Sequence, residues 1–277
     1  MGNFFISIDE LKNLIGTAAA PVIYDTCRAP VYSGHQRILP TARWRDHTDV
    51  ETWLPKIPAG AHVVVNCVHG HNVSQLAVSD LRRRGVNAQT LFGGIDGWIA
   101  EDGPTILKAA LPGRDEAKPS RWVTRIRPKI DRIACPWLIT RFIDREAEFY
   151  FVQPDYVAGV SKELGGIPYD IDGVAFTHVG ETCTFDTLID AFGLNDPALA
   201  ALKPIVRGAD TARLDLAPEA AGLAAASFGV SALAGGDDHK ALAHGFAIYD
   251  ALYAWQKFAQ AETHNWPAKT ASESAHA

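Results

Sequence analysis

The sequence predicts an α/β fold, in which a parallel sheet flanked by helices is followed by a mixed, mostly helical α+β part. In the first hundred residues, apolar runs of strand length alternate with helix-length segments, which is typical of strand–helix–strand units. From about Thr184 onward, apolar residues recur with helical spacing instead.

Each element of the first half has a local signal. The strands are short apolar runs, and the helices carry their apolar residues on one side. Gly85 is expected to end the longest of these helices, because glycine readily takes the left-handed conformation at a helix end. In chain order, the sequence predicts a helix over 7–15, strands over 22–24 and 62–66, a helix over 73–84 and a strand over 88–91.

A change of composition divides the chain. Residues 109–120 are rich in proline and charge, which is typical of a linker. We therefore expect a first domain over 1–108, a second over 121–262 and a disordered, polar tail over 263–277. In the second domain the sequence predicts strands over 122–127 and 148–152, a helix over 136–144, and a last helix over 239–260 that is capped by Asp237 or Asp238.

Composition argues against several classes of protein. The chain has 277 residues, of which 47% are hydrophobic and 21% charged, so it is globular and long enough for two domains. A net charge of −6 argues against a nucleic-acid partner. No apolar stretch reaches the ~18 residues of a membrane span, and no secretion signal opens the chain. Four scattered cysteines without a CxxC pair indicate reduced thiols and a cytoplasmic location.

Cys67 stands between a buried strand and the helix that follows it. A helix start offers free amides and the positive end of the helix dipole, and both stabilise an anion. A thiol placed there ionises more readily and is a better nucleophile at neutral pH. Gly70 would let the loop curl so that its amides point at the sulfur, and His69 and His71 would add positive charge. The sequence therefore predicts a reactive cysteine.

Three motifs in the first hundred residues follow one another in a familiar order. They are Asp25-Thr26-Cys27-Arg28 with Tyr32 and Gly34-His35, the loop Cys67–Asn72, and Gly93-Gly94 with Gly97-Trp98. On these motifs, residues 5–105 resemble a rhodanese domain. The resemblance implies a sulfurtransferase, in which Cys67 takes sulfur from a small donor such as thiosulfate, carries it as a persulfide and passes it to a thiol acceptor. It also implies that the loop binds the substrate through Val68, His69, Gly70, His71, Asn72 and Val73.

The loop departs from the rhodanese pattern in one respect. Relatives that use thiosulfate often carry Arg or Lys in the loop, whereas this loop has neither, so the donor stays open. Asp25 and Arg28 are expected to pair and brace the loop, and Cys27 fits a small core residue better than a resolving thiol. The alternative is that Cys67 is a structural cysteine in an inactive domain.

A second resemblance covers residues 122 to about 256. The segments that carry it are 127–139, 176–181, 205–210, 214–220 and 249–255. They resemble the C-terminal domain of the chromate-resistance family called ChrB, which implies a role in chromate resistance or sensing. The usual N-terminal half of the family's regulator is replaced here, so a repressor role does not carry over.

Polar residues in these segments suggest two kinds of site. Imidazole and carboxylate groups could bind a divalent or trivalent metal such as zinc, iron or manganese, through His178, Glu181, Asp210 and His239. Positive charge near a helix start at Pro136 would instead suit an oxyanion such as chromate, through Arg127, Lys129 and Arg132. The plainer alternatives are Asp238 as a helix cap, Arg207 and Asp210 as an ion pair, Glu181 as a surface acid, and Cys135 and Trp137 as core residues.

Two classes of function follow from the sequence. The first is an enzyme that moves sulfur through Cys67, or uses it in thiol redox chemistry, within a chromate or oxidative-stress response. The second is a chromate-, oxyanion- or metal-sensing binding protein whose rhodanese domain is inert. The sequence does not indicate an oligomeric state.

Overall fold

The structure is a computed structural model that describes residues 3–263. Its N-terminal part is built on a five-stranded sheet with the strand order β1-β6-β5-β2-β4, in which all neighbouring strands are parallel. The strands are β1 (Phe5–Ile6), β2 (Val22–Asp25), β4 (Arg43–Trp44), β5 (His62–Asn66) and β6 (Asn87–Leu91).

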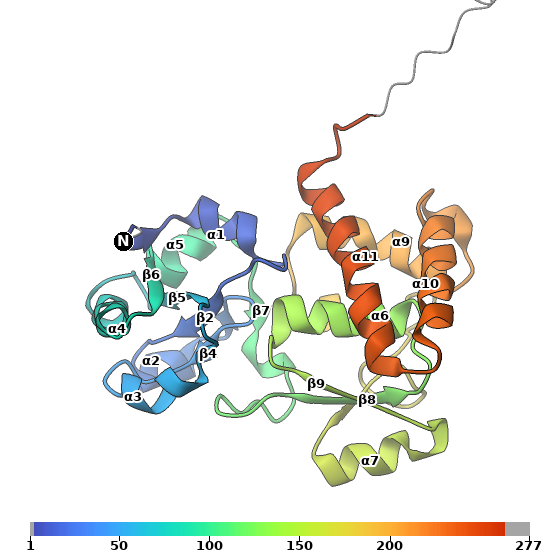
Figure 1. Ribbon diagram of the computed structural model, residues 1–277, viewed down its shortest axis with the longest axis horizontal. Helices are drawn as coiled ribbons and strands as arrows, with labels where there is room; N and C mark the ends of the chain where they lie inside the picture. The colour runs from blue at the N-terminus through green and yellow to red at the C-terminus, as the bar shows by residue number, and fades with distance from the viewer. Residues whose placement is uncertain (1–2, 264–277) are drawn as a thin grey trace, which may run out of the picture.

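Helices cover both faces of this sheet (Figure 1). Along β5, Val64 packs with the buried residues of α1 and α5, whereas Val63 and Val65 pack with those of α3 and α4. Burial on both faces explains why the sequence of β5 is a continuous apolar run. The helices of this part are α1 (Ile8–Leu14), α2 (Ala29–Gly34), α3 (Val50–Trp53), α4 (Asn72–Arg83) and α5 (Gly94–Ala100).

The C-terminal part combines a small parallel sheet with a group of helices. The sheet has the order β10-β8-β9, and α7 lies on one side of it while α6 and α11 lie on the other (Figure 1). The predicted α/β class with a largely helical second part is therefore confirmed. The elements are β8 (Arg121–Arg125), α6 (Asp131–Leu138), β9 (Glu148–Val152), α7 (Val157–Leu164), β10 (Ile167–Pro168), α8 (Thr184–Ala191), α9 (Pro197–Asp210), α10 (Ala220–Ala234) and α11 (Asp238–Phe258).

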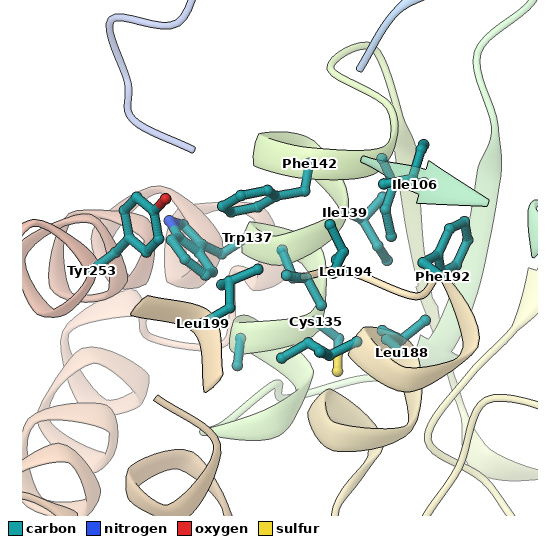
Figure 2. Packing of buried hydrophobic residues seen from close by; sticks show 14 of the residues in the cluster. Ile106, Cys135, Trp137, Ile139, Phe142, Leu188, Phe192, Leu194, Leu199 and Tyr253 are labelled. Carbon is teal, nitrogen blue, oxygen red and sulfur yellow. The ribbon is translucent and has the colours of Figure 1, made fainter. Parts of the chain in front are cut away.

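One hydrophobic core runs through both parts. Trp137, in the last turn of α6, has ring-centroid distances of 5.7 Å to Tyr253 and 6.0 Å to Tyr249. Figure 2 shows that this cluster extends to Ile106 of β7 (Ile106–Leu107), a strand that pairs antiparallel with β3 (Arg37–Ile38). The two parts therefore share buried apolar surface.

Several predicted boundaries are wrong. The helix expected over 136–144 begins at Asp131 and is followed by a π-helical turn, Ile139–Ile143, so Pro136 lies inside the helix and not at its start. The strand expected over 122–127 ends at Arg125, and Arg127 has a positive φ of 57° that an extended strand does not allow.

The end of the chain shows one further correction. Asp237 caps α11, since its side chain accepts a hydrogen bond from the Lys240 amide at 2.9 Å. Asp238 instead accepts one from the Arg127 amide at 2.8 Å, so it is not the cap. Beyond its first residue, the tail predicted over 263–277 lies outside the described residues. Within residues 3–263, no helix is long and apolar enough to cross a membrane.

A buried ion pair connects the two parts. Arg43 of β4 lies 2.7 Å from the Asp144 carboxylate, whose side chain is 3% exposed. The second oxygen of Asp144 accepts hydrogen bonds from the Ser120 amide and hydroxyl, both at 2.7 Å. Arg43 also donates to the carbonyl of Lys118 at 2.7 Å, so the segment predicted to be a linker is held from both sides.

We expect Asp144→Ala to destabilise the protein strongly, because it removes the buried carboxylate that pairs with Arg43 and accepts both Ser120 hydrogen bonds, and breaking a buried ion pair costs about 3–5 kcal/mol. Urea unfolding followed by circular dichroism measures the loss. The matched control is Arg83→Ala, which removes an ion pair to Asp80 from a side chain that is 70% exposed and should change little. Similar losses in the two variants would contradict a structural role for the buried pair.

Candidate functional site

Cys67 follows the last residue of β5, at the carboxyl edge of the five-stranded sheet. The residue is 5% exposed, so its sulfur lies at the bottom of the loop and not on the surface. The sulfur is 3.1 Å from the hydroxyl of Ser74 in the first turn of α4. This turn therefore places a polar group directly against the thiol.

The loop is held in place by the start of α5. The amides of Ile95 and Asp96 donate to the carbonyls of Cys67 and Val68 at 2.9 and 3.1 Å. Gly94 makes this close approach feasible, since a Cβ atom there would lie 2.3 Å from the Cys67 carbonyl oxygen. Gly70 has a φ of 71°, which supplies the sharp curl that was predicted for the loop.

The backbone amides of the loop are free to bind an anion. From Val68 to Ser74, no amide donates to an acceptor within residues 3–263, and the Gln75 amide is the first to do so, to the carbonyl of His71 at 3.0 Å. No side chain caps the start of α4. Uncapped amides at a helix start form an anion-binding site together with the helix dipole.

The side chains of the remaining loop residues differ in exposure. His69 and His71 are exposed, and their rings are 5.7 Å apart. His69 lies 3.2 Å from the carboxylate of Asp96. Asn72 is exposed, while Val68 and Val73 are half-buried. The loop residues that were predicted to bind substrate are thus gathered around Cys67.

The predicted pair between Asp25 and Arg28 is wrong. Asp25 is fully buried and accepts hydrogen bonds from the Cys27 amide at 2.8 Å and from the Asn66 side chain at 3.2 Å. Arg28 is exposed and forms no ion pair within the described part of the chain. The buried Asp25 carboxylate thus receives its hydrogen bonds from neutral groups. Asn66, and not Arg28, is the side chain that binds it.

Cys27 behaves as the predicted small core residue. It is 1% exposed, and burial, with a further contribution from Asp25, raises the pKa of its thiol. Its sulfur, the Asp25 carboxylate and an imidazole nitrogen of His35 lie within 4.8 Å of one another. A metal at this group would need a Cys27 thiolate, which the raised pKa opposes.

A second group of polar residues surrounds His178 in the C-terminal part. Its Nε2 atom lies 3.3 Å from Asp210, 3.4 Å from Asp170 and 3.6 Å from Asp131. Asp131 begins α6, Asp170 follows β10, and Asp210 ends α9. We call these four residues the His178 cluster.

The sequence predicted two members of this cluster and missed the others. His178 and Asp210 were expected to come together, and they do. Asp131 and Asp170 were overlooked, although Asp131 lies within a segment that carried the family resemblance. Glu181 is exposed and lines a separate pocket of about 240 Å³, and His239 packs edge-on against Phe151 at 5.6 Å.

Two other interpretations for this region are corrected. Arg207 does not pair with Asp210 but binds the fully buried Asp186 at 2.6 Å. The predicted oxyanion residues are also separated. Arg127 and Lys129 line a surface pocket of about 350 Å³, whereas Arg132 binds Asp170 at 3.2 Å as a neighbour of the His178 cluster. Cys135 and Trp137 are fully buried, as the core alternative predicted.

The carboxylates shift the protonation of the cluster. The neighbouring carboxylate of Asp131, followed by the charges of Asp210 and Asp170, raises the pKa of His178 to about 9. Burial raises the pKa of Asp210 to about 7 and also raises that of Asp170. Without another cation, the protonated imidazole of His178 is therefore held by carboxylates at neutral pH.

This shift predicts a pH-dependent stability. The pKa of His178 is about 9 in the folded protein, against an ordinary value of 6.5. The stabilisation is therefore complete below pH 6.5 and is lost as the pH rises through 9. Since 40% of the His178 side chain is exposed, solvent screening reduces the effect.

We expect the stability difference between the wild type and His178→Gln to shrink from pH 6 to pH 9.5. Urea unfolding in the presence of EDTA measures it at each pH. A difference that stays constant across this range would show that His178 does not titrate against the carboxylates.

Comparisons with known proteins support one of the resemblances directly. Residues 122–256 match the family model described as ChrB, C-terminal domain, which confirms the resemblance of this region. Protein ChrB of Cupriavidus metallidurans is 33% identical over 180 residues, which cover 64% of this chain and 52% of that protein. The chain thus spans about half the length of this curated relative.

Solved structures resemble the N-terminal part. A rhodanese-related protein from Thermoplasma volcanium is 24% identical with a TM-score of 0.34, and the match covers 38% of this chain and 100% of that one. A protein from Lactobacillus plantarum is 20% identical with a TM-score of 0.33, over 38% of this chain and 88% of that one.

Proposed function

We propose that the chain is a rhodanese-type sulfurtransferase that carries sulfur as a persulfide on Cys67, within chromate resistance or the response to oxidative stress. The observation that carries the proposal is the run of backbone amides from Val68 to Ser74 that have no acceptor within residues 3–263 and that directly follow a cysteine at a strand end. The link to chromate rests on the match of residues 122–256 to the ChrB C-terminal domain.

Sulfur transfer proceeds in two displacements. The Cys67 thiolate attacks the outer sulfur of a donor such as thiosulfate, the sulfur–sulfur bond of the donor breaks, and sulfite leaves with the bonding electrons. An acceptor thiolate then attacks the outer sulfur of the Cys67 persulfide. The acceptor keeps that sulfur, and the Cys67 thiolate is regenerated.

Each group around Cys67 has a role in these steps. The free loop amides stabilise the negative charge on the persulfide and on the leaving anion, as an oxyanion hole does. The Ser74 hydroxyl, 3.1 Å from the sulfur, can donate a hydrogen bond to the thiolate. With Cys67 5% exposed, the persulfide is shielded from bulk solvent, and the donor has to be small.

We expect Cys67→Ser to abolish persulfide formation. After incubation with thiosulfate or glutathione persulfide, the wild type should hold about one cyanolysable sulfur per chain, because a single thiol carries it. Intact-protein mass spectrometry would show the added sulfur. Cys27→Ser is the matched control and should retain it, since Cys27 is a core residue. A wild type that never gains sulfur from any common donor would refute the proposal.

The position of the loop can be tested through Gly94. Gly94→Ala should sharply lower persulfide formation, because the new Cβ would meet the Cys67 carbonyl at 2.3 Å and displace the loop. Gly60→Ala is the matched control, since Gly60 also has a positive φ, of 74°, but its Cβ would meet no atom within 4 Å. Both variants carry the backbone cost of a left-handed residue. Equal activity in the two would show that loop position does not matter.

A further inference from the structure

We propose that the His178 cluster binds one divalent transition-metal ion through Asp131, Asp170 and His178, whose ligand atoms all lie within 4.8 Å of one another. This inference does not depend on sulfur transfer at Cys67, because the four residues belong to the C-terminal part. It rests on the spacing of the inward-facing atoms, on the way each carboxylate is anchored, and on a buried hydroxyl without a partner.

The distances fit a metal centre better than hydrogen bonds. The three separations from Nε2 of His178 to carboxylate oxygens are 3.3, 3.4 and 3.6 Å. Good hydrogen bonds between nitrogen and oxygen lie at roughly 2.7–3.2 Å. Two ligands of a tetrahedral ion with bonds of ~2.0–2.1 Å are separated by about 3.3–3.4 Å. The imidazole and the carboxylates are therefore spaced like neighbouring ligands.

The carboxylate of Asp131 is fixed from outside the cluster. Its Oδ1 accepts hydrogen bonds from the Phe185 amide at 2.9 Å and from the Cys135 thiol at 3.2 Å. Its Oδ2 accepts one from the Thr184 amide at 2.8 Å and faces His178. Because α8 begins at Thr184, the first amides of a helix hold this carboxylate in place.

Asp170 and Asp210 follow the same pattern. Both arginine contacts of Asp170, to Arg125 at 2.8 Å and to Arg132 at 3.2 Å, use Oδ2, while Oδ1 faces His178. In Asp210, Oδ1 accepts a hydrogen bond from the Asp131 amide at 3.3 Å and Oδ2 faces His178. Outer partners that orient the ligands in this way are a general feature of metal sites.

Tyr169 gives a second, independent indication of a ligand. Its side chain is fully buried, and its hydroxyl has no hydrogen-bond partner within the described residues. Tyr169 directly precedes Asp170 in the chain, and burial, together with the nearby Cys135 and Asp170, raises the pKa of its hydroxyl. Leaving a buried hydroxyl unpaired is costly, and a water molecule bound to a metal would satisfy it.

The ligand types indicate the class of metal. Two carboxylates and one imidazole suit manganese, iron or zinc in the divalent state, whereas calcium and magnesium prefer oxygen ligands alone. The thiol of Cys135 donates to Asp131, so it acts as a positioning residue and not as a ligand. His178, 40% exposed, leaves a path by which an ion can enter.

Manganese is the best probe, because carboxylates bind it well and the four cysteines of the chain compete little for it. Full-length protein is treated with EDTA, desalted and titrated with Mn²⁺, while the free ion is followed by electron paramagnetic resonance. We expect one ion per chain. His178→Gln and Asp170→Asn should abolish this binding, and Cys135→Ala should weaken it by about 10–100-fold, as loss of an outer partner does.

The controls use the same types of side chain outside the cluster. Glu181→Gln and His239→Gln should bind Mn²⁺ like the wild type, and circular dichroism verifies that each variant is folded. Because Asp170→Asn is isosteric and His178 is partly exposed, at least one of the two test variants should fold. Absence of stoichiometric Mn²⁺ binding to the wild type, or unchanged binding in both test variants, would overturn the proposal. The His178 cluster would then be a structural network of ion pairs.

Discussion

A carboxylate that is buried away from water requires hydrogen-bond donors from the protein. Three buried aspartates find such donors on neighbouring strands, on helix starts and across the contact between the two parts. Asp25 binds donors at the ends of two neighbouring strands, next to Cys67. Asp144 joins the two parts through Arg43 and Ser120. Asp131 holds the start of α6 against the start of α8. A buried aspartate therefore helps to position each candidate site: Asp25 lies next to Cys67, and Asp131 belongs to the His178 cluster.

The two sites are complementary in charge. Around Cys67 the uncommitted groups are amide donors, which suit an anion. Around His178 the inward-facing groups are carboxylate oxygens, which suit a cation. The apolar core that runs from Trp137 to Ile106 connects the parts that carry them (Figure 2). The parts are thus packed together, although each site is assembled from residues of its own part.

The sequence was most informative where one local feature determines the structure. The strand over 62–66 and the loop after it were predicted because an apolar run, a cysteine and a glycine are adjacent. It was least informative where distant residues meet. Asp131 is placed by the packing of α6 against α8 and α9, and Asp170 follows β10, which pairs with β8; no local pattern reveals either arrangement. The start of α6 was missed because proline usually marks a first turn, whereas Pro136 lies deep inside the helix.

For the sulfur transfer that we propose, the attachment of the loop limits the choice of donor and acceptor. Cys67 is 5% exposed, and the carbonyls of Cys67 and Val68 are each bound by an amide of α5. Opening the loop to a bulky partner would break these hydrogen bonds and expose groups that are buried against Gly94. We therefore propose a low-molecular-weight donor and acceptor rather than a docked protein.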